Sequence, residues 1–362
     1  MASLEEKIRE LEEEIRKTPY NKATAHHIGR LKARIARLRE EAEKRSVKRR
    51  MGGGGYGVRK GGDATVVLVG YPSVGKSTLL NKLTGAKSEV GSYDFTTLRV
   101  VPGIMNYKKA RIQILDIPGI IEGASMGRGR GREVLSVVRS ADLIVLLVDA
   151  SNPSQLDIIK RELHSAGIRL NKKRPEIFIR KRKTGGINIS STSKLDFDED
   201  IIKSVLQEYK VHNADVLIRG KVEIDDIVDA LSERIMYKRA LTVFNKIDLC
   251  TQEGLKKLDE GAIFISAETG YGIDTLKERI YQELDLIRVF MRPQGGEPDL
   301  EEPLVLRKGS TIEDVCIRLH KDFVRKFRYA QVWGSSVKFD GQRVGLEHEL
   351  NDGDVVTIVI EK

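Results

Sequence analysis

An α/β fold built around a mostly parallel sheet is predicted for the centre of this 362-residue chain by three observations. From residue 65 onward, short β-branched runs alternate with helix-like segments and glycine turns. The strand-like runs are continuously apolar, as in strands that helices cover on both faces. A glycine-rich loop joins the first strand to the first helix. The expected strands are Thr65–Val69, Arg111–Leu115, Leu143–Asp149, Leu241–Phe244 and Ala262–Ile265.

The composition is that of a folded protein with more than one domain. The chain has 63 basic and 53 acidic residues, a net charge of +10, and 40% of its residues are hydrophobic. These values exclude a wholly disordered chain, a collagen and a disulfide scaffold. Cys250 and Cys316 are expected to be reduced thiols of a cytoplasmic protein. No apolar run approaches the roughly 20 residues of a membrane span, so no membrane contact is expected.

The N-terminal residues 1–50 are predicted to form a helical hairpin. Apolar residues recur every three or four positions over 4–15 and again over 28–42, and Thr18–Asn21 separates the two helices. Residues 51–62 follow as a glycine-rich basic linker. The first 60 residues carry 17 basic and 9 acidic side chains, a net of +8, which predicts an acidic neighbour at this end.

A separate insertion is predicted within the α/β domain, which spans 63–290. The third and fourth strands are 91 residues apart, whereas one strand–helix–strand crossover takes about 30. The insertion is placed at 160–235, with strands at Ile177–Lys181 and Gly186–Ile189 and a helix at Asp198–Tyr209. Its segment Arg169–Lys183 has a net charge of +7 and is a second candidate for contact with nucleic acid.

The C-terminal residues 291–362 are predicted to form a small α+β domain. A last helix of the α/β domain is expected near Asp274–Leu286, and Pro293–Pro298 breaks the chain after it. Strands and one helix follow in the apolar pattern of the remaining residues. With 11 basic and 13 acidic residues, this domain does not share the positive charge of the rest.

The glycine-rich loop has the full phosphate-loop pattern in its required strand–loop–helix context. Its backbone N–H groups are expected to surround the β- and γ-phosphates of a nucleotide, at a helix N-terminus that favours anions. Lys76 should neutralise phosphate oxygens and Ser77 should bind Mg²⁺. The loop residues are Gly70, Tyr71, Pro72, Ser73, Val74, Gly75, Lys76 and Ser77, with Thr78 next in the helix.

Three later segments complete the predicted nucleotide site. Asp116 ends the second strand, where it can hold Mg²⁺ through water, and the N–H of Gly119 can reach the γ-phosphate. Asn245–Asp248 follows the fourth strand, and the Asp248 carboxylate can accept hydrogen bonds from N1–H and the 2-amino group of guanine. Adenine lacks both donors and would leave this carboxylate unpaired. Ser266–Glu268 follows the fifth strand, where a backbone N–H can reach guanine O6.

Taken in order, these motifs resemble those of translation-factor-class GTPases. Tyr93–Leu98 and Asp116–Ala124 resemble the Obg superfamily, and Gly127–Gly131 with the ending Tyr329–Asp354 resembles its developmentally regulated GTP-binding proteins, of archaeal type. The resemblance covers essentially the whole chain. It implies a P-loop GTPase domain with a helical N-terminal hairpin, a small inserted domain of the ribosomal-S5-like type and a C-terminal TGS domain of β-grasp fold.

The resemblance also implies the activity and the partners. It implies an enzyme that binds GTP and GDP with Mg²⁺, hydrolyses GTP as a molecular switch and acts on cytoplasmic ribosomes, with ribosomal RNA as a partner and no DNA. The expected catalytic residues are Lys76, Thr97 and Gly119, and the expected Mg²⁺ ligands are Ser77, Thr97 and Asp116. Thr96 is the alternative to Thr97. The further residues placed at the nucleotide are Phe95, Ile117, Pro118, Lys246, Ser266, Ala267 and Glu268.

Two positions qualify this mechanism. Ile120 stands where many GTPases have a glutamine that orients the attacking water, so slow hydrolysis is expected unless another group, a cation or a regulatory protein partner positions the water. Ser73 stands where related GTPases have an asparagine that holds K⁺, and its hydroxyl leaves K⁺ stimulation open. The alternative to the switch is a ribosome- or RNA-binding scaffold in which the nucleotide is mainly structural. The oligomeric state is not predicted.

Overall fold

The computed structural model describes residues 4–19, 21, 24–48, 61–85, 93–95, 98–117, 131–251 and 261–361. The chain divides into two compact units, Met1–Gly55 with Leu163–Lys238, and Tyr56–Glu162 with Arg239–Lys362. Residues 51–60 of the predicted linker lie outside the described residues. Within the described ranges, no helix has both the length and the apolarity needed to cross a membrane.

The mostly parallel sheet predicted from the sequence is confirmed in the second unit. Its strands lie in the order β11-β10-β5-β1-β4-β3-β2. Pairing is parallel from β11 to β4, and the described pairs β3–β4 and β2–β3 are antiparallel. The bounds are β1 Ala64–Val69, β2 Tyr93–Phe95, β3 Leu98–Tyr107, β4 Ala110–Asp116, β5 Leu143–Asp149, β10 Met236–Asn245 and β11 Ile263–Phe264.

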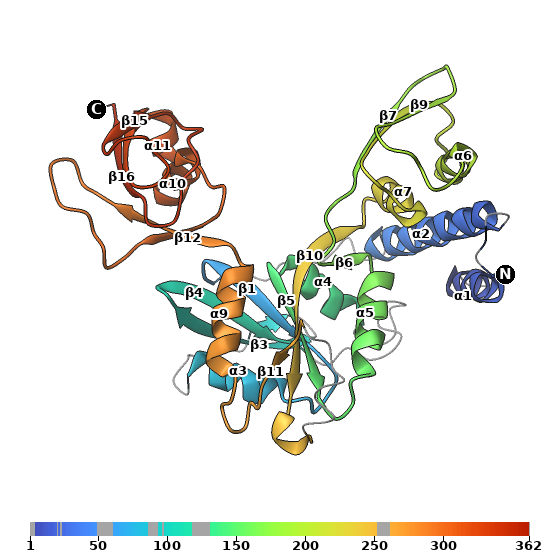
Figure 1. Ribbon diagram of the computed structural model, residues 1–362, viewed down its shortest axis with the longest axis horizontal. Helices are drawn as coiled ribbons and strands as arrows, with labels where there is room; N and C mark the ends of the chain where they lie inside the picture. Colours follow the sequence, from blue (N-terminus) through green and yellow to red (C-terminus); the bar gives the residue numbers. More distant parts are fainter. Residues whose placement is uncertain are drawn as a thin grey trace. The chain divides into compact units, whose positions relative to one another are not determined.

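Helices cover both faces of this sheet, as the continuously apolar strands predict. Figure 1 shows α3 and α9 on one face and α4 and α5 on the other. Every residue of β1 is buried. Ala64, Val66 and Leu68 share one core with Leu79 and Leu80 of α3 and Leu276 and Ile280 of α9. The helix bounds are α3 Lys76–Thr84, α4 Gly131–Ser140, α5 Gln155–Ser165 and α9 Ile273–Glu283.

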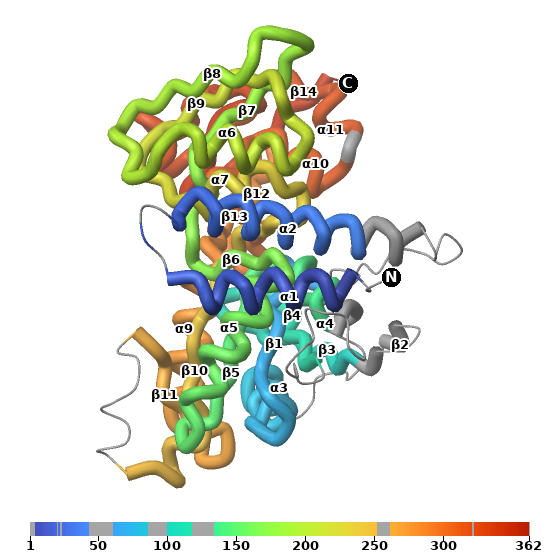
Figure 2. Tube along the Cα trace, turned by 90° about the vertical axis from the view of Figure 1, so that its right-hand side faces the viewer, coloured from blue at the N-terminus to red at the C-terminus, as the bar shows by residue number. Residues whose placement is uncertain are grey.

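The first unit combines the N-terminal hairpin with the insertion, which the sequence places in separate segments at 1–50 and 160–235. Its sheet has the order β7-β9-β8, and β6 pairs with the start of β10. Figure 2 shows α1 and α2 side by side. The bounds are α1 Leu4–Lys17, α2 Ala25–Lys48, β6 Ile168–Leu170, β7 Glu176–Lys181, β8 Ile187–Ser191, α6 Glu199–Glu208, β9 Ala214–Arg219 and α7 Ile224–Leu231.

Helix α2 has two buried faces. Ile28, Leu31 and Ile35, which belong to the predicted apolar seam, are buried. Ala25 and Ala33 lie in a second core with α6 and α7. A Cβ atom on Gly29 would approach Ile201 of α6 to 3.1 Å, so only a small residue allows this close packing. The sequence pattern did not reveal this second face, because alanine and glycine carry a weak apolar signal.

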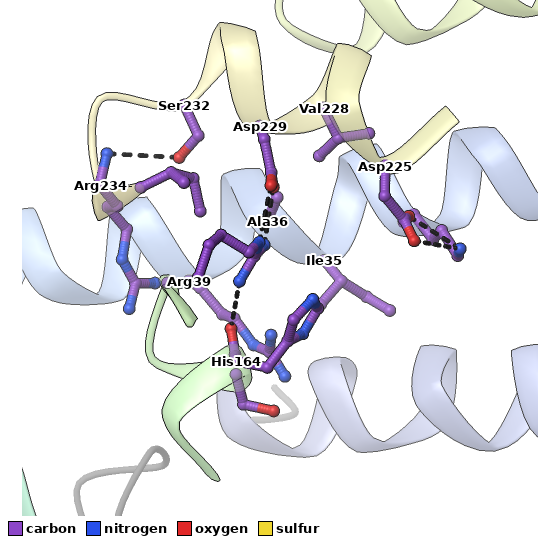
Figure 3. Close-up of a pocket in the computed structure, with 14 residues that line it drawn as sticks. Ile35, Ala36, Arg39, His164, Asp225, Val228, Asp229, Ser232 and Arg234 are labelled. Carbon is purple, nitrogen blue, oxygen red and sulfur yellow. Dashed lines mark hydrogen bonds and ion pairs between the residues drawn. The ribbon is translucent and has the colours of Figure 1, made fainter. Parts of the chain in front are cut away.

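Basic side chains of both charged segments hold the first unit together. A cavity of about 310 Å³ lies where α2, α7 and the end of α5 meet (Figure 3). Beside it, Arg169 donates hydrogen bonds to both carboxylate oxygens of Asp229, each at 2.6 Å, and to the carbonyl oxygen of His164 at 2.7 Å. Lys32 pairs with Asp225 at 2.8 Å. Part of the positive charge counted in the sequence is therefore neutralised inside this unit.

Replacing Asp229 with alanine should lower the free energy of unfolding by about 3–5 kcal/mol, because it leaves the Arg169 guanidinium buried without its carboxylate. The side chains of Arg169 and Asp229 are only 10% and 2% exposed. The pair of Arg182 with Asp215 is far more exposed, so the control Asp215→Ala should cost about 1 kcal/mol or less. Urea unfolding followed by circular dichroism measures both losses, and equal losses would contradict the structural role of Arg169.

The C-terminal part has its own five-stranded sheet, in the order β13-β12-β16-β14-β15. Helix α10 packs on it through Val315 and Cys316. Strand β12 begins at Leu286, where the sequence predicts the end of a helix; α9 instead ends at Glu283, and Asp285 has a φ of 48° that turns the chain. The bounds are β12 Leu286–Met291, β13 Leu304–Arg307, α10 Ile312–Leu319, α11 Lys321–Arg325, β14 Phe327–Trp333, β15 Gln342–Val344 and β16 Val355–Ile360.

Candidate functional site

The predicted phosphate loop connects the central strand β1 to α3. Gly70 approaches the neighbouring strand so closely that a Cβ atom there would lie 2.3 Å from the carbonyl oxygen of Leu147. Gly75 has a φ of 96°, in the region that favours glycine, immediately before α3 begins at Lys76. Pro72 and Ser73 are exposed, and Ser73 has a φ of 61°. The loop therefore curls around the N-terminus of α3, as phosphate binding requires.

Lys76, Ser77 and Asp116 converge at the mouth of this loop. The Lys76 ammonium donates to the carbonyl oxygens of Gly70 at 3.2 Å and Tyr71 at 2.9 Å. The Ser77 hydroxyl donates to the Asp116 carboxylate at 2.6 Å. Burial lowers the pKa of Lys76, with the charge of Asp116 opposing, and burial raises the pKa of Asp116, with Ser77 and Lys76 opposing. Both charges are thus incompletely compensated, which favours binding of a phosphate group and a cation.

The Asn245 side chain ties the phosphate loop to the fifth-strand loop. Its Nδ2 donates to the carbonyl oxygen of Val74 at 2.8 Å, and its Oδ1 accepts from the N–H of Ala267 at 2.9 Å. Asn245 is 2% exposed. A Cβ atom on Gly75 would lie 2.5 Å from its Nδ2. The sequence places Asn245 at the nucleotide, and the structure shows in addition that this amide connects two loops that surround the site.

Asn245→Ala should weaken GTP and GDP about tenfold each and lower the free energy of unfolding by about 1–3 kcal/mol, because it leaves a buried carbonyl and a buried N–H without their partner. Isothermal titration and thermal unfolding measure the two effects. Asn188→Ala, at an exposed amide of β8, is the control. An equal loss of affinity for GTP and for GDP would show that Asn245 connects the loops. A contact with the γ-phosphate would weaken binding of GTP alone.

The guanine-recognition segments lie at the same edge of the sheet, because β1, β4, β10 and β11 all end there. Asp248 is exposed in a short 3₁₀ helix, Ile247–Leu249. Ser266 is buried, and its hydroxyl accepts from the N–H of Thr269 at 3.2 Å. Glu268 is exposed beside it. The structure therefore brings the phosphate loop, Asp116 and both predicted base-recognition loops to one edge.

Sequence reasoning missed one residue at this edge, Asp149. Its carboxylate pairs with the ammonium of Lys246 at 2.8 Å and accepts from the hydroxyl of Ser151 at 2.6 Å. Burial alone would raise the pKa of Asp149, but the bonds from Lys246 and Ser151 outweigh it and lower the pKa. Lys246 has a φ of 64°. The available signal was an acidic residue at the end of β5, the strand beside β10.

Several predicted residues lie outside the described ranges. They are Thr96, Thr97, Pro118, Gly119 and Ile120. Phe95 is the last residue of β2, and Ile117 is buried after β4. Among the described residues, no three His, Cys, Asp or Glu side chains gather as a metal site. The Ser77 and Asp116 oxygens nevertheless fit Mg²⁺, a hard cation that is held by one or two carboxylates and substrate phosphates.

Comparison with known proteins matches family models to most of the chain. Residues 65–182 match a model described as 50S ribosome-binding GTPase, and residues 184–286 match the C-terminal region of that domain. A developmentally regulated G-protein of Arabidopsis thaliana is 47% identical, covering 99% of this chain and 99% of its own. The chain belongs to the family of developmentally regulated GTP-binding proteins. Residues 287–360 match the TGS domain, which this GTP-binding protein carries at its C-terminus.

Similar proteins of other organisms match almost the whole chain. A GTP-binding protein of Methanocaldococcus jannaschii is 55% identical over 99% of this chain and 93% of its own length. One of Schizosaccharomyces pombe is 48% identical over 99% and 100%. The G domain of the T. maritima FeoB iron transporter is 22% identical, with a TM-score of 0.32 over 61% of this chain and 98% of that one, too weak a likeness to carry an argument. The resemblance to the developmentally regulated family is thereby confirmed.

Proposed function

We propose that this GTP-binding protein hydrolyses GTP to GDP and phosphate as a molecular switch that acts on ribosomes in the cytoplasm. The observation that carries the proposal is the meeting of Lys76, Ser77 and Asp116 with the loops of Asp248 and Ser266 at one edge of the sheet. The basic segments and the description of the matched family as ribosome-binding support the ribosome as partner.

Each residue at the phosphate loop has a separate role in the proposed hydrolysis of GTP. Lys76 leaves the loop carbonyls and neutralises oxygens of the β- and γ-phosphates as negative charge moves onto the leaving group. Ser77 and Asp116 would hold Mg²⁺, Asp116 through a water molecule. Bound Mg²⁺ neutralises phosphate charge. Thr97 and Gly119 complete the proposed site as sensors of the γ-phosphate. No described residue is assigned to position the attacking water; another group, a cation or a regulatory protein partner is proposed for that step.

Phosphate release from GTP and ATP, with and without ribosomes, tests the proposed activity. The expected result is slow release from GTP alone, faster release with ribosomes and no useful turnover of ATP. The exposed Ser73 hydroxyl is available to a monovalent cation, so the same assay in KCl and NaCl tests K⁺ stimulation. Equal turnover of ATP and GTP would contradict the base recognition assigned to Asp248.

A further inference from the structure

The three-stranded sheet of the first unit has one open face. Figure 1 shows α6 and α7 on one side of the β7–β9 pair. Isoleucines of β7 and β8 face those helices in the core. The alternate residues point the other way, and there Phe178 is 54% exposed, an unusual position for a phenylalanine. The register pairs Phe178 with Leu217 and Leu217 with Ser190, so the three form one row across this face.

Arginines and polar groups surround Phe178. The Arg219 guanidinium carbon lies 5.6 Å from the centre of the Phe178 ring, a cation–π contact. In the next row, Arg180 pairs in register with Asp215, and Asp215 with Asn188. Asp215 is the acidic member of this row, and Arg182 neutralises it at 2.5 Å. The face therefore offers a ring, cations and hydrogen-bonding groups.

The charge around this face is positive even after the internal ion pairs are removed. Arg169 and Lys172 of the basic segment bind Asp229 and Asp226 inside the unit. The remaining basic side chains of that segment are exposed on β7, before it and in the turn that follows it. Near the open face these are Lys173, Arg174, Arg180 and Lys183, whereas Lys181 lies on the same face of β7 as Ile177 and Ile179. One acidic residue, Glu176, also lies on the open face, in register with Arg219.

We infer that this face, centred on Phe178 and Arg219, binds single-stranded RNA, with a base stacked on the Phe178 ring. An exposed ring on an open sheet with neighbouring arginines provides the stacking and phosphate contacts that unpaired nucleotides use. A base in a duplex cannot reach the ring, which separates this site from general attraction to phosphates. An acidic protein surface could bind the arginines, but it would not supply an unpaired base to stack on the ring. The choice of RNA rests on the proposed function.

Fluorescence anisotropy with labelled oligouridine and with its duplex with oligoadenosine tests the inference on the full chain. Phe178→Ala should weaken binding of the single strand about tenfold. The salt dependence of binding should not change, because no ion pair is lost. Phe178→Tyr should restore binding. Arg180→Gln should weaken both RNAs and reduce the slope of log affinity against log salt by about 1. In the Phe178→Trp variant, the fluorescence of the tryptophan at position 178 should be quenched when the single strand binds.

Phe339→Ala and Lys203→Gln are the matched controls, because Phe339 is exposed outside this face and Lys203 lies on α6, partly exposed. Equal losses for Phe178→Ala and Phe339→Ala, or equal losses for single strand and duplex with Phe178→Ala, would overturn the inference. Binding to an acidic peptide without binding to oligouridine would overturn it in favour of a protein partner. If wild type binds ribosomes only with GTP but does not bind oligouridine, the inference fails and the proposed switch stands. If ribosome binding is the same with and without nucleotide, and RNA binding depends on Phe178, the proposed switch fails and the inference stands.

Discussion

Lys76→Ala should reduce the rate of GTP hydrolysis about 100-fold or more, because it removes the cation that balances the developing charge on the phosphates. Lys76 is 8% exposed, and its ammonium donates to the carbonyl oxygens of Gly70 and Tyr71. Single-turnover phosphate release at saturating GTP measures the loss in the chemical step. Ser77→Ala should give a comparable loss, which rising Mg²⁺ concentration should not restore fully.

The effect of Lys76→Ala should be confined to function. Burial lowers the pKa of Lys76 and so disfavours its charge, whereas the hydrogen bonds to the carbonyls of Gly70 and Tyr71 stabilise it. Because these effects oppose each other, the variant should change the melting temperature of the protein far less than it changes hydrolysis. Lys82→Ala, at an exposed lysine of the same helix, is the matched control and should hydrolyse GTP normally. Equal activities of the two variants would refute the role of Lys76.

Asp248→Asn should weaken GTP about 100-fold and make xanthosine triphosphate the better ligand. In the proposed site, the Asp248 carboxylate accepts hydrogen bonds from N1–H and the 2-amino group of guanine. An asparagine amide accepts one hydrogen bond and presents N–H donors, which oppose the 2-amino group of guanine but match the 2-oxo group of xanthine. Titration with fluorescent analogues of both nucleotides measures the change.

The control for this exchange is Asp274→Asn, a carboxylate that is 97% exposed at the start of α9. It should change neither affinity. Asp248→Asn removes the same charge from the same part of the chain, so any difference between the two variants belongs to contact with the base. Unchanged preference for GTP in Asp248→Asn would place guanine recognition elsewhere.

The elements and loops that local patterns define could be predicted from the sequence. The phosphate loop is contiguous, and its glycines meet requirements visible within a few residues: Gly75 has a φ of 96°, and Gly70 leaves no room for a Cβ atom. The role of Asn245 could not be predicted this way, because it depends on Val74 and Ala267, which three separate loops bring together.

The sequence likewise could not show which basic residues are neutralised inside the fold. A count gives Arg169 and Lys32 the same weight as any exposed cation. In the fold, Arg169 is buried against Asp229, sixty positions away in the chain, and Lys32 pairs with Asp225. The docking of α2 on α6 was missed for a related reason, because Gly29 and Ala33 pack by being small and give no periodic apolar signal.

Sedimentation with ribosomes tests the central claim most directly. The full-length protein is mixed with ribosomes in three states: with a non-hydrolysable GTP analogue, with GDP and without nucleotide. A switch that docks through its GTP state predicts strong co-sedimentation with the analogue and little with GDP or without nucleotide. Asp248→Asn should respond in the same way to the xanthosine analogue. Equal co-sedimentation in all three states would contradict the switch and support a scaffold in which the nucleotide is structural.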